Sequence, residues 1–560
     1  MKTNGGQFLH FSRVLFWRTM VAVLAAPSYL PANLHDDTLA ELSIPKIKTH
    51  LAYLASDQLG GRATGSMGAK LAADYIADQL SKSKVKPFGA KNSYFQNIPM
   101  HGSKPLKESR LRFSTRDETR TFELGQDYLL YDAGAPTYIA APREMVFVGY
   151  GIVAPEYDYN DYLSVDVEGK IVVFINGEPI SDEEDYFAGA RNTIHANVDV
   201  KQRVALSRGA MGTILLPNPR TEKNIPWHYW QQQFAFENVS LLYARATNLN
   251  ILLNPQMATA LFKGSPFEYR HVVDMVNADL LQSFKMAGKL AFKGAFKEWE
   301  FSDQNVIGII PGRDKKLKNE YVMVSAHYDH LGIGPAVNGD SIYNGFGDNA
   351  IGVSATLEIA RVLATAPKPP KRSVIFLFTT GEERGLLGAT YYIDHPRVPL
   401  YKTFVSLNID GIAMFDTFND FVGIGAEHST LENVLKNLAD SFSLTYSRVP
   451  AIFANSNAFG RSDQIVFARE GIPALALLEG LNYKHFTFEQ GLLRFVEWGE
   501  KYYHTPFDDL QQPINYDAVE QHCELLVALV SKLANQVKSI DFYPNSPFLN
   551  ARLQSIAEER

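Results

Sequence analysis

Short apolar runs that end in histidine or carboxylate side chains recur in the second half of this chain. Three such runs are residues 322–326, 374–378 and 404–409. Each has the length and composition of a buried strand. The polar residues that follow them are, in order, His327 and Asp329, Glu382 and Glu383, and Asp410. Because α/β sheets place their sites at the carboxyl ends of strands, we expect these side chains to lie at one sheet edge.

Helical patterns separate and flank these strands, which predicts an α/β protein. A Gly- and Asn-rich loop presents Asp348 and Asn349 just before a helix that we expect to begin near Ile351. Other helices are expected at residues 68–82, where apolar residues recur at helical spacing, and at 518–537. The segment Tyr503-His504-Thr505-Pro506-Phe507-Asp508 reads as a turn before the last of these helices.

The residue types at the strand ends favour metal binding. Imidazole and carboxylate ligands together suit zinc, and two zinc ions need a carboxylate shared between them. The His-x-Asp pair at 327 and 329 is informative because a ligating histidine usually gives its second ring N–H to a carboxylate, which fixes the orientation of the ring. Each motif alone also occurs by chance on surfaces or in cores, so the order of all of them carries the prediction.

The ordered motifs resemble the M28 family of di-zinc exopeptidases. They are H-x-D at 327, D-N at 348, E-E at 382, N-x-D at 408 and Y-H-T-P-x-D at 503. Further similar segments are G-R-x-x-G-S at 61–66 and G-I-P at 471–473. The resemblance implies a three-layer α/β/α catalytic domain with a mixed sheet, two zinc ions per chain and peptides as substrates.

The resemblance also implies a role for each site residue. Asp348 would bridge the two metals, with His327 and Asp410 completing one site and Glu383 and His504 the other. Glu382 would be the general base, Asp329 would support His327, and Tyr503 would donate to the oxyanion. For Tyr503 the alternative is simple packing beside the ligand, which leaves both interpretations open. Ile351, Gly411 and Gln464 depart from the usual family pattern, which leaves specificity open.

The region from 138 to 288 has a different pattern, in which strand-like runs such as 145–150 and 170–175 are separated by acidic and aromatic loops. It resembles the protease-associated (PA) domain, although strand patterns alone would also fit another small insertion. The expected organisation is a leader at 1–32, catalytic segments at 40–137 and 289–540, the β-rich PA-like insert at 138–288, and a tail at 541–560.

Composition excludes several classes of function. The chain has 560 residues and a net charge of −7, which gives no indication of a nucleic-acid partner. Its one cysteine, Cys523, excludes an intrachain disulfide and a four-cysteine zinc site. Beyond the leader, no stretch approaches the length of a stable membrane span. The sequence predicts no particular oligomeric state.

The first 32 residues have the pattern of a secretory signal. Lys2, Arg13 and Arg18 precede the apolar stretch 20–26, and small residues follow it. We therefore expect export to the periplasm or the extracellular space, with a leader of no targeting role as the alternative.

Three functions remain open from the sequence. The first is a zinc-dependent aminopeptidase, which hydrolyses N-terminal residues from peptides. The second is a carboxypeptidase or dipeptidase, for which arginines such as Arg461 or Arg469 would bind a substrate carboxylate. The third is a catalytically inactive binding protein, against which the complete ligand set argues.

Overall fold

The computed structural model describes residues 41–557, except for 132–137, 182, 184, 188, 190–191, 246–247, 451–452 and 454–457. The expected leader at 1–32 lies outside the described residues. Within the described part, no helix combines the length and the apolar character needed to cross a membrane.

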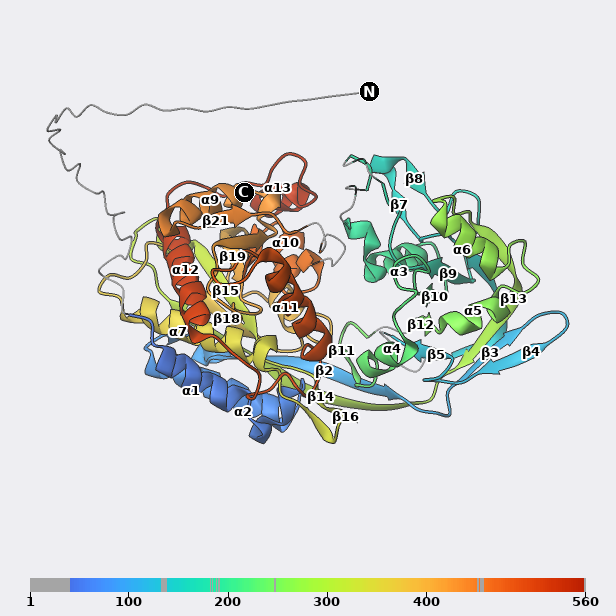
Figure 1. Cartoon of the computed structure of the whole chain (residues 1–560), viewed down its shortest axis with the longest axis horizontal. Helices are drawn as coiled ribbons and strands as arrows, with labels where there is room; N and C mark the ends of the chain where they lie inside the picture. Colours follow the sequence, from blue (N-terminus) through green and yellow to red (C-terminus); the bar gives the residue numbers. More distant parts are fainter. Residues whose placement is uncertain are drawn as a thin grey trace, which may run out of the picture. The chain divides into compact units, whose positions relative to one another are not determined.

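A ten-stranded mixed sheet forms the framework of the predicted catalytic region (Figure 1). In spatial order its strands are β11 (Asn238–Leu241), β2 (Phe95–Pro105), β14 (Phe296–Ile310), β18 (Ser373–Thr379), β15 (Tyr321–His327), β19 (Thr403–Asn408), β22 (Ala474–Glu479), β20 (Asp420–Ile424) and β21 (Thr445–Ser447), with β1 (Lys86–Pro87) beside β14. The four strands β18, β15, β19 and β22 are mutually parallel, and β2 and β14 pair with their neighbours in antiparallel fashion. β20 is antiparallel to β22 and parallel to β21.

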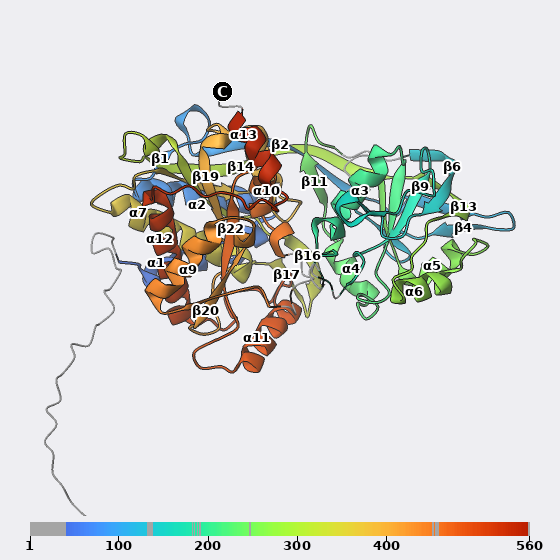
Figure 2. The same cartoon turned by 90° about the horizontal axis from the view of Figure 1, so that it is seen from above.

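Helices cover both faces of this sheet, because side chains alternate between two cores. In β15, Val322 and Val324 belong to one core and Met323 to the other. The helices on the first core are α1 (Ile44–Leu54), α2 (Met67–Lys82), α7 (Ile351–Thr365), α9 (Leu431–Phe442) and α12 (Tyr516–Asn535). Those on the second are α8 (Leu387–Asp394), α10 (Gln464–Arg469) and α13 (Leu549–Ala557). The helices α7 and α12 lie side by side in both views (Figures 1 and 2). The predicted three-layer α/β class with a mixed sheet is therefore confirmed.

A second, eight-stranded sheet has its own cores. Its strands are β4 (Thr119–Phe122), β3 (Arg110–Ser114), β13 (Phe284–Lys293), β6 (Tyr138–Phe147), β9 (Ile171–Ile175), β10 (Gly212–Leu216), β12 (Leu249–Leu253) and β5 (Tyr128–Leu130). Its helices are α3 (Val198–Ser207), α4 (Trp227–Gln233), α5 (Pro255–Leu261) and α6 (Tyr269–Asn277). The sheet takes strands from before residue 138, and β11, which lies within the expected insert, belongs to the other sheet.

Smaller elements complete the described chain. The ribbons β16 (Gly332–Val337) with β17 (Asp340–Tyr343), and β7 (Val153–Ala154) with β8 (Tyr159–Asn160), are each two-stranded. Helix α11 (Phe488–Lys501) begins with a capping box at Thr487 and Gln490. The segment expected as a polar tail contains α13, because Phe548 at its start packs against Phe459 and Phe542.

One buried histidine makes the stability of the fold depend on pH. His522 on α12 is fully buried, its Nδ1 accepts from the Ala413 N–H at 2.9 Å, and its Nε2 faces the Leu477 carbonyl at 3.2 Å. Burial lowers the pKa of His522 from 6.5 to about 4. The folded chain therefore holds this imidazole neutral where the unfolded chain binds a proton, so stability falls as pH drops from 6.5 toward 4.

We predict that His522→Gln flattens this pH dependence. One proton taken up on unfolding gives a slope of about 1.4 kcal/mol per pH unit between pH 4 and 6.5, which the variant lacks. Urea unfolding at half-unit pH steps measures the slopes. A variant with the wild-type slope would contradict a neutral buried His522.

Candidate metal centre

Three parallel neighbours bring three of the predicted ligands to one sheet edge. His327 is the last residue of β15 and pairs with Thr379, the last residue of β18. The turn after β18 carries Glu382 and Glu383, and Asp410 lies two residues beyond the end of β19. The parallel register therefore aligns the ends of these strands, as the sequence pattern predicted.

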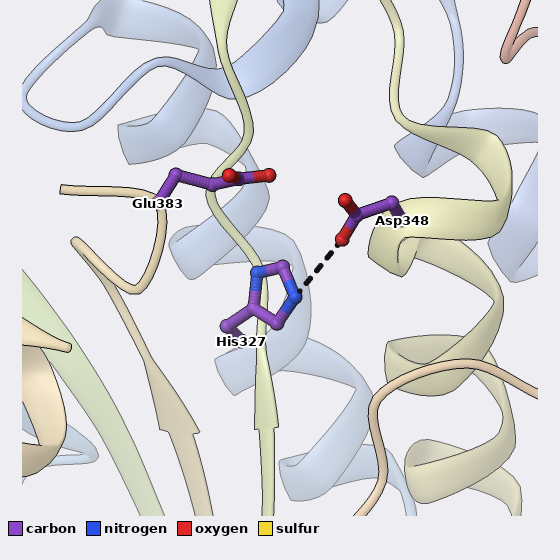
Figure 3. A group of neighbouring side chains, drawn as sticks. All are labelled: His327, Asp348 and Glu383. Carbon is purple, nitrogen blue, oxygen red and sulfur yellow. Dashed lines mark ion pairs between the residues drawn. The ribbon is translucent and has the colours of Figure 1, made fainter. Parts of the chain in front are cut away.

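The other two ligands come from loops. Asp348 lies in η6 (Phe346–Ala350), a single π-type turn that leads into α7. His504 lies in the turn after α11 with a positive φ of 54°. Figure 3 shows the carboxylates of Asp348 and Glu383 directed toward each other above the ring of His327, each side chain coming from a different segment.

The carboxylate of Asp348 lies between the two histidines. Its Oδ1 is 3.2 Å from His327 Nε2, and its Oδ2 is 3.2 Å from His504 Nε2. Asp410 Oδ1 lies 3.1 Å from His327 Nε2, and Glu383 Oε2 lies 3.2 Å from His504 Nε2. All five predicted ligands thus meet, in two groups that share Asp348.

These separations are also close to those expected for atoms that bind one metal ion. Atoms bound to one tetrahedral zinc at 2.0–2.1 Å lie about 3.4 Å apart. His504 Nε2 is buried and has no hydrogen-bond partner among the described residues, although two carboxylate oxygens lie 3.2 Å away. An orphaned ring nitrogen that faces two carboxylate oxygens is what a ligand set converging on a cation would present.

The charges of the cluster also suit a bound cation. Burial opposes protonation of His504, yet the carboxylates of Glu383 and Asp348 raise its pKa to about 10. Burial likewise opposes protonation of His327, but Glu382 and Asp410 raise its pKa well above 6.5. Without metal, the imidazoles would carry protons to balance the carboxylates, and divalent cations would replace those protons.

Glu382 is placed beside the ligands rather than among them. Its main-chain N–H donates to Asp329 Oδ1 at 3.1 Å. Burial raises the pKa of its carboxyl well above 4.5, and the nearby carboxylates of Asp410 and Glu383 add to that shift. Bound cations would lower this pKa again and return the group to its carboxylate form.

Asp329 supports the site through two routes. The Nδ1 of His327 is 3.2 Å from the main-chain carbonyl of Asp329 and 3.9 Å from its carboxylate Oδ1. The carboxylate accepts instead from the Glu382 N–H and from Thr64 Oγ1, at 3.1 Å each. The supporting role implied for Asp329 is therefore shared between its carbonyl, for His327, and its carboxylate, for the turn at Glu382.

Tyr503 stacks on His504, with ring centroids 3.9 Å apart and planes 17° from parallel. Its hydroxyl accepts from Arg461 Nη2 at 3.1 Å. Burial and the charge of Asp348 hold the pKa of Tyr503 well above 10, so the hydroxyl keeps its proton. Arg469 pairs with Asp199 at 3.7 Å, and its side chain is not placed with Arg461 on Tyr503.

Sequence analysis assigned no individual role to three residues that contact the site. Asp508 accepts from the Gly347 and Asp348 N–H groups at 2.8 and 3.0 Å. The buried Arg62 donates to the carbonyls of Tyr328, Asn344 and Gly345, which flank two ligand segments. His330 is fully buried, and its Nδ1 is 2.6 Å from Glu383 Oε1. Its position three residues after His327 was the available signal.

Asp463 illustrates a local pattern that the fold overrides. Asp463 immediately precedes α10, but its side chain makes no capping hydrogen bond. Its Oδ2 instead accepts from Thr379 Oγ1 at 2.6 Å, at the end of β18.

We predict that Asp508→Asn weakens the Asp348 loop. An amide offers one oxygen where the carboxylate uses two, so one main-chain N–H loses its acceptor, at a cost of about 1–3 kcal/mol. Zinc affinity should fall with it, because Asp348 serves both groups of ligands. Asp509→Asn, the adjacent residue, is the control that should leave unfolding and zinc titration unchanged. Equal zinc affinity in the two variants would contradict this role for Asp508.

Comparisons with known proteins agree with this geometry. Residues 305–530 match the model of peptidase family M28. Aminopeptidase YwaD of Bacillus subtilis (strain 168) is 27% identical over 249 residues, which are 42% of this chain and 46% of that protein. A probable leucine aminopeptidase 2 of Aspergillus oryzae is 28% identical over 274 residues, 45% of this chain and 49% of that protein. The chain thus spans about half the length of the curated relatives it matches.

One solved structure supports the fold over most of the chain. An aminopeptidase from Aneurinibacillus sp. strain AM-1 aligns with a TM-score of 0.52 at 18% identity and covers 90% of this chain and 97% of its own. The matched residues 305–530 contain all five candidate ligands and Glu382. Residues 305–530 of this chain are therefore similar to peptidase family M28.

Proposed function

We propose that this protein is a zinc-dependent exopeptidase that hydrolyses N-terminal residues from peptides, with two zinc ions per chain. The observation that carries the proposal is the Asp348 carboxylate, whose two oxygens each lie 3.2 Å from a different histidine. His327 and Asp410 would hold one ion, and Glu383 and His504 the other. The relatives named aminopeptidases support the choice of terminus.

Bound zinc would supply Lewis acidity, which polarises a carbonyl oxygen and lowers the pKa of water. Glu382 would take a proton from the attacking water as the oxygen–carbon bond forms. It would then give that proton to the leaving amine as the carbon–nitrogen bond breaks. Tyr503 keeps its hydroxyl proton and would donate to the carbonyl oxygen as negative charge develops there.

The remaining parts of the chain extend this proposal. The eight-stranded sheet would correspond to the PA-like insert, supported by the strand content of residues 138–288. The basic and apolar pattern of residues 1–32 supports export to the periplasm or the extracellular space.

One observation favours a second candidate, a carboxypeptidase or dipeptidase. Arg461 donates to the hydroxyl of Tyr503, and the ring of Tyr503 stacks on His504. The side chain of Tyr503 therefore connects the Arg461 guanidinium to one of the proposed metal ligands. A guanidinium in this place could bind a substrate carboxylate. Arg469 pairs instead with Asp199, so these two arginines do not form a cluster.

We predict cleavage of short peptides with a free N-terminus and an amidated C-terminus. Matched peptides with an acetylated N-terminus and a free C-terminus should remain intact. Activity should disappear on chelation and return with zinc, and mass spectrometry of the products identifies the bond that is cut. Cleavage of the acetylated set alone would establish the second candidate.

We also predict that Glu382→Gln keeps its zinc but loses turnover by about 10²–10⁴-fold, because an amide cannot accept the proton. Metal analysis and kcat are measured on the same preparation. Glu300→Gln, on an exposed residue of β14, is the matched control and should behave as wild type. Near-normal hydrolysis by Glu382→Gln would mean that another group is the base.

A further inference from the structure

The chain between β10 and β12 leaves the eight-stranded sheet, pairs with the ten-stranded sheet and returns. The part from α4 to β11, residues 227–241, is called the excursion. β10 and β12 are parallel neighbours in the eight-stranded sheet. Between them the chain forms α4 and then β11, which pairs with β2 at the edge of the ten-stranded sheet. Sheet pairing of β11 fixes where α4 must lie, because only four residues separate the two elements.

Apolar contacts anchor this excursion to the segments that carry the metal ligands. Phe236 is buried with Leu331 and Tyr343, and its ring meets that of Tyr343 edge to face at 5.1 Å. Leu331 lies four residues after His327. The Arg384 guanidinium, next to Glu383, lies 5.3 Å from the centre of the Phe236 ring. Figure 2 shows α4 beside β16 and β17.

The excursion reaches a metal ligand directly through Gln233, the last residue of α4. The Oε1 of Gln233 is 3.3 Å from Nδ1 of His504, across 271 positions of sequence. The opposite ring nitrogen, Nε2, faces Asp348 and Glu383. A neutral histidine that binds metal through Nε2 carries its proton on Nδ1, and that N–H requires an acceptor that fixes the ring.

The two histidines obtain this acceptor differently. For His327 it is the carbonyl of Asp329, two residues along the same segment. For His504 it is a side chain of the excursion, so the orientation of this ligand depends on the docking of α4.

We propose that Gln233 is a positioning residue of the metal centre, and that zinc binding at His504 and docking of α4 stabilise each other. This inference rests on the zinc centre of the proposed function. Because coupling between two equilibria is reciprocal, removing the Gln233 acceptor weakens zinc, and removing zinc loosens α4.

Zinc affinity, measured by competition with a chromophoric chelator, tests the first half. Gln233→Leu removes the acceptor, and one of the two zinc ions should bind about 10–100-fold more weakly. Gln233→Glu restores an acceptor and should stay within about threefold of wild type. Gln232→Leu is the matched control, because Gln232 is the preceding residue of α4. It lines a cavity of about 480 Å³ beside His504 but makes no hydrogen bond to His504.

Wild-type zinc affinity in Gln233→Leu would overturn the inference and leave the proposed function intact. A wild-type protein that binds no zinc would overturn both. If Gln233→Leu and Gln232→Leu weakened zinc binding equally, the inference would also be overturned. The effect would then come from the helix surface rather than from the loss of the Gln233 acceptor.

Hydrogen–deuterium exchange tests the second half without any measure of activity. In the full chain, zinc should slow exchange across residues 227–236, and this protection should be lost in Gln233→Leu but kept in Gln232→Leu. Exchange in the wild type that is unaffected by zinc would overturn the coupling.

Discussion

The position of one carboxylate, Asp348 between His327 and His504, is the constraint on which the site depends. The two histidines lie 177 positions apart, on a strand end and in a late turn. Both must be fixed to within a few tenths of an ångström for one carboxylate to serve them. The molecule meets this requirement by building the site on the ends of parallel strands, whose register is set by sheet hydrogen bonds and by a core on each face.

The segments that do not belong to the sheet are held by buried polar groups. Asp508 accepts two N–H groups of the loop that carries Asp348, and Arg62 donates to the carbonyls of Asn344 and Gly345, which lead into that loop. Burying a carboxylate or a guanidinium is costly unless its hydrogen bonds are satisfied, which both are here. Among the candidate ligands, the buried Nε2 of His504 has no hydrogen-bond partner in the described part of the chain, and a bound cation would satisfy it.

The sequence predicted the elements and residues whose signals are local. The runs at 322–326, 374–378 and 404–409 became β15, β18 and β19, because a buried strand in a parallel sheet is apolar on both faces. Four of the five candidate ligands were recognisable because each follows such a run or precedes a helix, and His504 was recognisable only through the family-like motif at 503–508. Their roles as ligands, and the role of Glu382 as base, remain predictions.

Contacts between distant segments could not be predicted in the same way. Nothing near Gln233 indicates that α4 ends against His504, and β11 has only four residues, too few for a periodic pattern. Asp508 and Arg62 act on the site only by hydrogen-bonding to main-chain groups that lie far away in the sequence. Every residue carries such main-chain groups, so the residue types do not indicate these contacts. His330 belongs to none of the sequence motifs, and only the fold brings it to Glu383.

The most direct test of the central claim is anomalous diffraction at the zinc edge from crystals of the full chain grown with zinc. Sharing of Asp348 predicts two peaks about 3.5–4 Å apart, one beside His327 and Asp410 and the other beside Glu383 and His504, with the carboxylate of Asp348 between them. A single peak, or two peaks that do not share Asp348, would contradict a two-metal centre built on this carboxylate.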